Sequence, residues 1–278
     1  MSDQEDFFRE VEREYWAEAE GLKDEERVLI ERFLDPSAPT LDAGTGGGRL
    51  PRAMAAAGFE TLTGFDFAPE LIVAARAADS TGRIAFDVAD ATALGYPDGA
   101  FEQVLYLQQI VCTIEEPEGR TAAMREAARV LAPGGVALFS FVCFESRLAS
   151  PAQRGYVAYL RALRRAKRDP RPLQSMPRLR LRGRADAGAL RDRGPYNWWY
   201  RAAEAEAALE AAGLNVTRIG FGPGVIEGEM HKGAGAALKA GAHGTLYAAC
   251  ERVNAVALLA ADPAPAGVPT VPAAARTA

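Results

Sequence analysis

The chain has 278 residues, of which 49% are hydrophobic and 25% are charged, and its formal net charge is −5. This composition is ordinary for a globular protein, and the negative net charge argues against a protein that mainly binds nucleic acid. The three cysteines lie far apart with no C-x-x-C spacing, so we expect neither a metal site nor a disulfide framework. The acidic N-terminus lacks the apolar core of a signal peptide, and no run approaches about 18 apolar residues. We therefore expect a cytoplasmic protein without a membrane span.

Residues 3–34 open the chain with a helical pattern of apolar positions, which Pro36 and Pro39 end. We expect residues 1–35 to form an N-terminal helical cap. Short apolar runs then alternate with helix-like stretches, which predicts βαβ units, a parallel sheet and helices on both faces. The expected strands are 40–44, 61–66, 83–90, 101–108 and 136–144, and the expected helices are 49–58, 69–79 and 120–131, the last followed by the turn APGG.

Residues 154–193 differ sharply in charge from the rest of the chain. They hold twelve Arg and one Lys against three Asp. The strand pattern resumes afterwards with a helix at 200–213 and strands at 215–221 and 244–253. We therefore expect a helical Arg-rich insertion over residues 146–195 within one domain of residues 1–261. Residues 262–278 are rich in Ala and Pro and are expected to be a disordered tail.

The role of the insertion has several interpretations. Tyr156, Tyr159, Leu160 and Leu163 have helical spacing, which predicts a solvated helical cap over the active site. Thirteen cations could instead contact the phosphates of RNA. A surface for a partner or for a negatively charged substrate is the third interpretation.

The stretch LDAGTGGGRL, residues 41–50, lies between a predicted strand and a predicted helix, where open α/β sheets bind ligands. Gly44, Gly46 and Gly48 stand at alternate positions, more glycine than a tight turn alone requires. Glycine also lacks the Cβ that would keep a ligand away from the backbone. The dinucleotide fingerprint would need glycine where Arg49 stands, and no G-K-[ST] follows for a P-loop.

Two acidic positions follow at the ends of the next strands. A carboxylate at Asp66 can accept hydrogen bonds from both hydroxyls of a ribose, or it can cap the helix that follows. Asp90 can accept the exocyclic amine of an adenine while the Ala91 amide donates to a ring nitrogen, or Asp90 can simply start a loop. The ribose contact of Asp66 does not distinguish a dinucleotide from an adenosyl sulfonium.

Together these motifs resemble the class I S-adenosylmethionine-dependent methyltransferases of the small-molecule type. The resemblance is good over about residues 25–145 and loose over 196–253, with Thr45 in place of the cysteine that is commoner in relatives. It implies a Rossmann-like, seven-stranded, mostly parallel sheet with helices on both faces and a terminal antiparallel strand. It also implies that S-adenosylmethionine contacts these residues: Asp42, Ala43, Gly44, Thr45, Gly46, Arg49, Asp66, Phe67, Asp90, Ala91, Leu107 and Gln108.

The resemblance implies methyl transfer to oxygen or nitrogen of a small molecule, as in specialised metabolite biosynthesis. The fourth strand carries LYLQQI and not Asn-Pro-Pro-Tyr, which argues against a nucleobase or amide acceptor. Three alternatives stay open: an RNA methyltransferase that uses the Arg-rich insertion, a methyltransferase-like enzyme that catalyses another reaction, and a non-catalytic binder of the cofactor.

A sulfonium carries its own activation, so the enzyme must mainly align the two reactants and exclude water. No fixed catalytic triad is expected, and the sequence leaves the catalytic residue and the oligomeric state open. The candidate bases are His231, His243, Glu145, Tyr106 and Tyr200. We expect the acceptor to contact Tyr15, Gln109, Trp199 and Tyr200, although Tyr15-Trp16 and the aromatic run at 196–200 could equally be packing residues.

Overall fold

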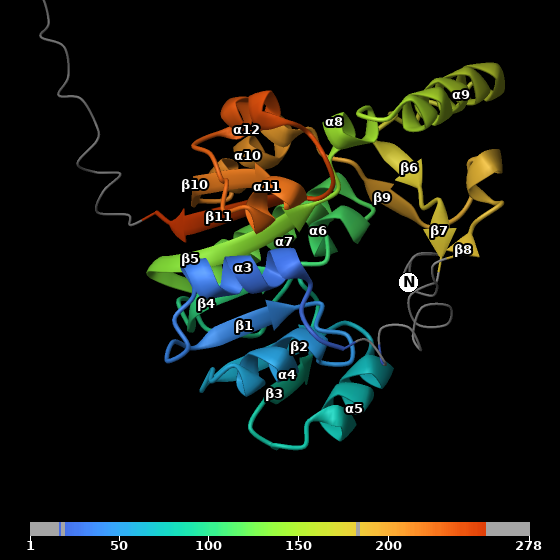
Figure 1. Cartoon of the computed structure of the whole chain (residues 1–278). Coiled ribbons are helices and arrows are strands. Elements are labelled where there is room, and N and C mark those ends of the chain that lie inside the picture. Colours follow the sequence, from blue (N-terminus) through green and yellow to red (C-terminus); the bar gives the residue numbers. More distant parts are fainter. Residues whose placement is uncertain (1–16, 18–19, 182–183, 254–278) are drawn as a thin grey trace, which may run out of the picture.

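The computed structural model describes residue 17 and residues 20–181 and 184–253. A seven-stranded sheet forms the centre of the molecule, with strand order β10-β11-β5-β4-β1-β2-β3 (Figure 1). Neighbouring strands from β3 to β5 pair in parallel, and β11 is antiparallel to both β5 and β10. The strands are β1 (Thr40–Ala43), β2 (Leu62–Asp66), β3 (Ala85–Val88), β4 (Phe101–Tyr106), β5 (Leu131–Phe141), β10 (Leu214–Phe221) and β11 (Leu246–Arg252).

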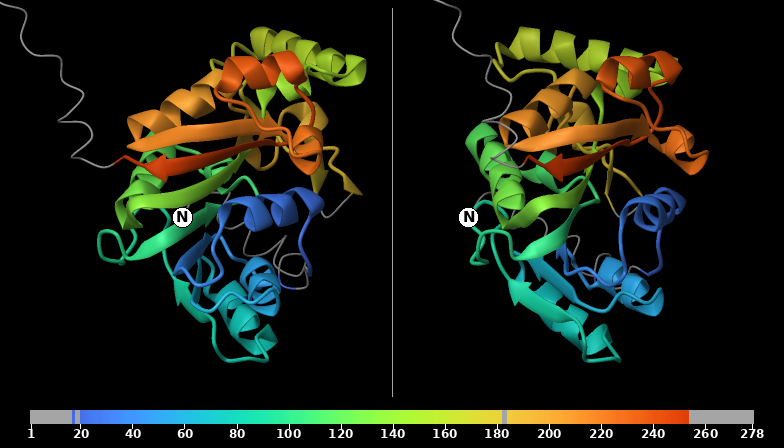
Figure 2. Two further views of the ribbon diagram at one scale, coloured as in Figure 1. Left: turned by 60° about the vertical axis from the view of Figure 1, so that its left-hand side comes forward. Right: turned by 90° about the vertical axis from the view of Figure 1, so that its left-hand side faces the viewer.

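Helices cover both faces of this sheet (Figure 2). One face is covered by α3 (Asp24–Phe33), α4 (Arg49–Ala56), α5 (Pro69–Ala78) and α11 (Gly222–Ile226). The other face is covered by α6 (Ile110–Thr113), α7 (Pro117–Val130), α10 (Ala202–Ala211) and α12 (Ala234–Ala240). No described helix is both long enough and apolar enough to cross a bilayer.

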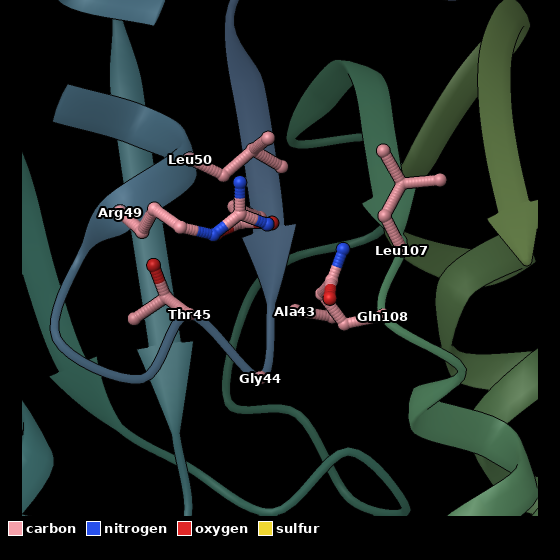
Figure 3. Close-up of a pocket in the computed structure, with 8 residues that line it drawn as sticks. Ala43, Gly44, Thr45, Arg49, Leu50, Leu107 and Gln108 are labelled. Atoms are coloured by element: carbon pink, nitrogen blue, oxygen red, sulfur yellow. The ribbon is translucent and has the colours of Figure 1, made fainter. Parts of the chain in front are cut away.

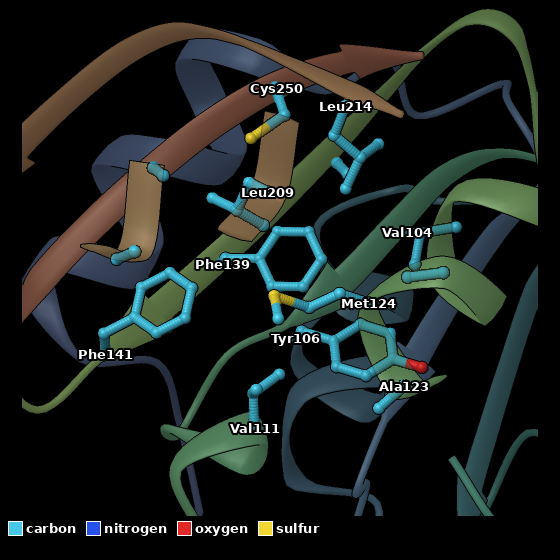
Figure 4. Close-up of a cluster of buried hydrophobic side chains, with 14 of the residues drawn as sticks. Val104, Tyr106, Val111, Ala123, Met124, Phe139, Phe141, Leu209, Leu214 and Cys250 are labelled. Carbon is cyan, nitrogen blue, oxygen red and sulfur yellow. The ribbon is translucent and has the colours of Figure 1, made fainter. Parts of the chain in front are cut away.

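Alternation along the central strands divides the core into two layers. Val104 and Tyr106 of β4 face one cluster of buried side chains, and Leu105 faces the other. On β5, Phe139 lies in the first cluster with its ring stacked on Tyr106 at 5.2 Å (Figure 4), and Leu138 lies in the second. Successive side chains of a strand point to opposite faces, so both faces of these strands are apolar and both must be covered.

The predicted fold class is confirmed, including the terminal antiparallel strand. Several strand boundaries differ from the prediction, most of all at β5, which begins at Leu131, so that the predicted APGG turn lies inside the strand. The pairing of β4 with β5 shifts register between Phe101 and Gln103, and Gly134 has a φ of 78°. Such an irregularity lets extra residues leave the ladder without ending the strand.

The insertion between β5 and α10 is only partly helical. It contains α8 (Phe144–Arg147), α9 (Pro151–Lys167), the 3-10 turn η1 (Ala189–Arg191), and short strands β6 (Ser175–Pro177), β7 (Arg180–Leu181), β8 (Arg184–Ala185) and β9 (Tyr196–Trp198). The prolines at 170, 172 and 177 explain why the helix does not continue beyond α9. In both views α9 lies at the opposite end of the molecule from β3 and α5 (Figures 1 and 2).

The insertion has a small apolar core of its own and begins and ends at the same place. Its buried core residues are Phe144, Val157, Leu160 and Met176. Tyr200 N donates to Val142 O at 3.0 Å, and Phe144 N donates to Tyr200 O at 2.8 Å. The two ends of the insertion are therefore hydrogen-bonded neighbours beside the carboxyl end of β5.

Candidate functional site

The loop that joins β1 to α4 holds three glycines in a conformation that other residues rarely adopt. Gly44, Gly46 and Gly48 have φ angles of 62°, 56° and 75°. An L-residue with a Cβ loses about 1–2 kcal/mol in this left-handed region. A Cβ on Gly44 would lie 2.4 Å from Cδ1 of Ile110, and a Cβ on Gly48 would lie 2.8 Å from the ring of Phe86. The glycines thus allow the left-handed backbone of the loop. At positions 44 and 48 they also leave room for the side chains of Ile110 and Phe86.

Backbone N–H groups tie this loop to β2. Thr45 N donates to Phe65 O at 2.9 Å, and Gly46 N donates to Oδ2 of Asp66 at 3.0 Å. Ala68 N donates to Oδ1 of Asp66 at 3.0 Å, so one carboxylate holds both the glycine loop and the start of α5. Burial raises the pKa of Asp66, and these backbone bonds oppose the rise. Because a carboxylate offers about four acceptor positions, Asp66 keeps acceptors for the predicted ribose.

A pocket opens where the end of β1, the glycine loop, the start of α4 and the end of β4 meet (Figure 3). All of the residues that line it except Leu50 were predicted from the sequence to contact a cofactor. Leu50 was missed because a leucine inside an apolar helix is typical of an ordinary core position. The lining residues are Asp42, Ala43, Gly44, Thr45, Arg49, Leu50, Leu107 and Gln108.

Asp42 places an acid on the floor of this pocket. It is only 4% exposed, and this burial raises the pKa of its carboxyl from the ordinary 3.8 to about 7. The guanidinium of Arg49 partly opposes the rise. Asp42 therefore gains or loses its charge near neutral pH, where a bound cation would favour the charged form.

A buried ion pair supports the pocket from α3. Arg49 donates Nη1 and Nη2 to the two carboxylate oxygens of Glu26 at 2.8 and 2.9 Å, and Glu26 is fully buried. Nε2 of Gln108 also donates to Glu26, and Nζ of Lys23 donates to Oε1 of Gln108 at 2.7 Å. Glu26 therefore links α3, α4 and the end of β4. The sequence did not single it out, because nothing distinguishes it from its neighbours in the acidic run DEE.

The chain leaves β4 through two strained residues. Gln108 and Gln109 have φ angles of 62° and 61°, although neither is glycine. Residues held in this region cost about 1–3 kcal/mol each and occur often at ligand sites. Ser140 on β5 helps to hold them, because Gln109 N donates to its Oγ at 2.8 Å. The predicted contact of Gln109 with an acceptor stays a prediction.

Asp90 and Ala91 follow β3, next to β2 in the sheet. Both N and Oγ1 of Thr92 donate to Oδ1 of Asp90 at 2.8 Å, which is the loop-starting arrangement considered for this acid. Asp90 is exposed and Ala91 is partly buried. Asp42 and Asp66 thus lie at the carboxyl ends of β1 and β2, and Asp90 lies just beyond that of the adjacent β3. The adenine contacts of Asp90 and Ala91 stay predictions.

Residues 41–139, which include the glycine loop and all three acids, match a family model described as a methyltransferase domain. This part of the chain is therefore similar to a methyltransferase domain, in agreement with its resemblance to the class I S-adenosylmethionine-dependent methyltransferases. S-adenosylmethionine is the cofactor of this family. The pocket fits it: Gly44 of the glycine loop lines it, and Asp42 offers a carboxylate to a cationic ligand.

The chain is 31% identical over 143 residues to 27-O-demethylrifamycin SV methyltransferase of Amycolatopsis mediterranei (strain S699), across 48% of this chain and 51% of that protein. The match thus spans about half the length of that relative.

Two solved structures show the same fold. An S-adenosylmethionine-dependent methyltransferase from Methanosarcina mazei has a TM-score of 0.60 at 18% identity, covering 81% of this chain and 97% of that one. The 1,6-didemethyltoxoflavin-N1-methyltransferase of Burkholderia thailandensis, solved with 1,6-didemethyltoxoflavin and S-adenosylhomocysteine bound, has a TM-score of 0.55 at 16% identity, covering 90% and 87%.

Three of the candidate bases lie away from the pocket. Glu145 is engaged on α8, where it accepts from Ala202 N at 3.2 Å and lies 3.5 Å from Nη1 of Arg201. His231 pairs through its backbone with Ile219 on β10, and His243 is exposed. None of these side chains lines the pocket, so the structure singles out no base among them.

The two tyrosines considered as bases lie in the core. Tyr106 and Tyr200 are buried, and burial raises the pKa of both phenols. A phenol of this kind releases its proton less readily than one in water. Neither lines the pocket.

The aromatic run at 196–200 is divided between two cores. The ring of Tyr200 contacts Phe141 edge-on at 5.0 Å in the main core. Trp199 packs against the core of the insertion, and its N donates to Gln174 O at 2.8 Å. Both therefore have packing roles, and their contact with an acceptor stays a prediction. Tyr15 and Trp16 lie outside the described residues.

Proposed function

We propose that this protein transfers a methyl group from S-adenosylmethionine to an oxygen or nitrogen of a small molecule. The observation that carries the proposal is the pocket beside the glycine loop, together with acids at or just beyond the carboxyl ends of three adjacent strands. In this proposal the residues that line the pocket hold the methionine part of the donor. Asp66 holds the ribose, and Asp90 with Ala91 holds the adenine.

Two similarities support a small-molecule acceptor and specialised biosynthesis. The relative from Amycolatopsis is named for a demethylated rifamycin, and the Burkholderia structure holds 1,6-didemethyltoxoflavin. The described cysteines Cys112, Cys143 and Cys250 are all free thiols, which is compatible with a reducing cytoplasm.

The bound sulfonium supplies an activated methyl group. The chain would hold donor and acceptor in line and keep water out. The strained backbone of Gln108 and Gln109 fixes the wall between the donor pocket and β5. The insertion, attached at the end of β5, would cover the acceptor from above.

Exposed arginines along α9 favour RNA as a second candidate acceptor. Some cations of the insertion are already used in structure: Arg164 pairs with Asp192, and Arg171 pairs with Asp169 and Asp192. The exposed arginines of α9 and its C-cap, which remain available to phosphates, are Arg154, Arg161, Arg165 and Arg168.

Calorimetry with S-adenosylmethionine, S-adenosylhomocysteine and NAD tests the donor. Preference for NAD, or no binding of either sulfur compound, would end the proposal. Incubation of the protein with isotopically labelled donor and a panel of small phenols, acids and amines, read by mass spectrometry, tests the transfer. Salt-dependent RNA binding with methylated RNA as the product would favour the second candidate. A new product without added methyl would indicate a different reaction.

A further inference from the structure

Arg147 is a buried cation without a hydrogen-bond or ion-pair partner for its side chain among the described residues. It ends α8, the short helix that follows β5, and is only 7% exposed. Its Nε and Nη2 atoms are buried and have no hydrogen-bond partner, and it forms no ion pair with any described residue. Burial of an unpaired charge costs several kcal/mol, so this arrangement calls for a physical reason.

Aromatic rings cover the faces of this guanidinium. The Cζ of Arg147 lies 4.5 Å from the ring centroid of Trp199 and 5.5 Å from that of Tyr156. Stacking of this kind orients the plane of the group, but its N–H bonds point outward along the edges. The rings therefore position the guanidinium and leave the hydrogen-bonding edge unused.

A second buried arginine in the same insertion shows what this edge normally binds. Arg164 donates Nε to one oxygen of Asp192 at 2.7 Å and Nη2 to the other at 2.8 Å. It is 3% exposed, close to the value for Arg147. Nε and Nη2 of Arg164 thus bind a carboxylate as a two-pronged fork, whereas the same two nitrogens of Arg147 have no carboxylate to bind.

We propose that the Nε–Nη2 edge of Arg147 binds a carboxylate of the acceptor molecule. The inference rests on the proposed function, because it names the chemical class of acceptor that the site would take. Arg147 follows β5, and β5 adjoins β4, whose end carries Gln109; Ser140 of β5 bonds the Gln109 backbone. Trp199 and Tyr156 add flat apolar surface, which favours a planar acid.

Both nitrogens are buried in this structure, so the proposal requires that the atoms of the insertion around them move aside when the acid binds. The apolar core of the insertion is separate from the two cores of the sheet. Such a movement therefore leaves the packing of the sheet and the donor pocket intact.

Calorimetry on the complex with S-adenosylhomocysteine tests the proposal with matched probes: 4-hydroxybenzoate against 4-hydroxybenzamide, and 2-naphthoate against 2-naphthamide. The acids are expected to bind at least about 10-fold more tightly than the amides, as for a charge-assisted fork. Arg147→Met should remove this preference, and Arg147→Lys should weaken it by loss of the fork. Arg161→Gln, at an exposed arginine of α9, is the matched control and should keep it.

Equal affinity of wild-type protein for acids and amides would overturn the proposal, as would a preference that survives in Arg147→Met. Tighter binding of phenyl phosphate than of 4-hydroxybenzoate would overturn the choice of a carboxylate. If S-adenosylhomocysteine itself does not bind, the proposed function fails first. If it binds but the acids show no advantage, only the carboxylate site fails.

Thermal unfolding without ligand separates this role from a structural one. Arg147→Met removes an unpaired buried charge and keeps an apolar chain of similar length, so the midpoint temperature should stay the same or rise. A large fall in the midpoint would show that Arg147 supports the insertion itself and would overturn the proposal.

Discussion

Replacement of Asp42 by asparagine tests the charge on the floor of the donor pocket. Burial raises the pKa of this carboxyl from 3.8 to about 7, so the folded chain holds the proton more tightly than the unfolded chain. The folded state then binds more protons than the unfolded state between these two values. The contribution of Asp42 to the stability is therefore greatest at low pH, falls as the pH rises toward about 7, and changes little above that value.

The size of the effect follows from the pKa shift. One unit corresponds to about 1.4 kcal/mol, so two pH units inside the window correspond to about 3 kcal/mol. Asp42→Asn carries no titratable group at this position. The free energy of unfolding of Asp42→Asn, taken relative to that of the wild type, should therefore be higher at about pH 7 than at about pH 5. The expected increase in this difference is about 3 kcal/mol.

Urea unfolding of the wild type and of Asp42→Asn over this pH range measures the difference between their free energies of unfolding. The other titratable groups are present in both proteins, so their contributions cancel. Calorimetry adds a second readout: an ionised Asp42 attracts the cationic donor, so wild-type affinity for S-adenosylmethionine should rise through about pH 7 more steeply than that of Asp42→Asn. A stability difference that does not vary with pH would refute the reasoning that burial keeps the proton on Asp42.

Three further substitutions test the supports of the pocket. Glu26→Gln leaves the guanidinium of Arg49 buried without its carboxylate and should lower the free energy of unfolding by about 3–5 kcal/mol in urea titrations. Gly44→Ala should lower it by more than Gly82→Ala, since both glycines have a φ of 62° but only Gly44 has a side chain within reach of an added Cβ; equal losses would contradict the steric argument. Asp66→Ala should weaken S-adenosylhomocysteine binding by about 1.5–3 kcal/mol in calorimetry, and unchanged affinity would mean that the ribose lies elsewhere.

The sheet and the glycine loop could be predicted because their signals are local. Alternating apolar runs define strands wherever both faces are buried, and glycines at alternate positions mark a backbone that needs positive φ. Seven of the residues that line the pocket, from Asp42 at the end of β1 to Gln108 after β4, were predicted through the family resemblance that these signals carry. Each of them lies beside a strand end that the sequence shows directly.

The supports of the site could not be predicted, because they depend on contacts between distant segments. Glu26 is one of several acids on an exposed-looking helix, and only the fold brings it to Arg49 and Gln108. Likewise, the aromatic run near Trp199 showed large apolar surface but not which core would take it. The left-handed backbone of Gln109 has no sequence signature, since glutamine does not favour it.

The closed ends of the insertion have a consequence for how this protein can change. Residues 144–199 leave and rejoin the sheet through hydrogen bonds between Tyr200 and both Val142 and Phe144. The entropy of closing a loop rises only slowly with its length, so an excursion of different size or sequence can be accommodated between the same two anchors. The insertion can thus change independently of the donor pocket, both in evolution and in engineering. Under the proposed function, exchange of residues 144–199 alone should alter which acceptor is methylated and leave the donor pocket unchanged.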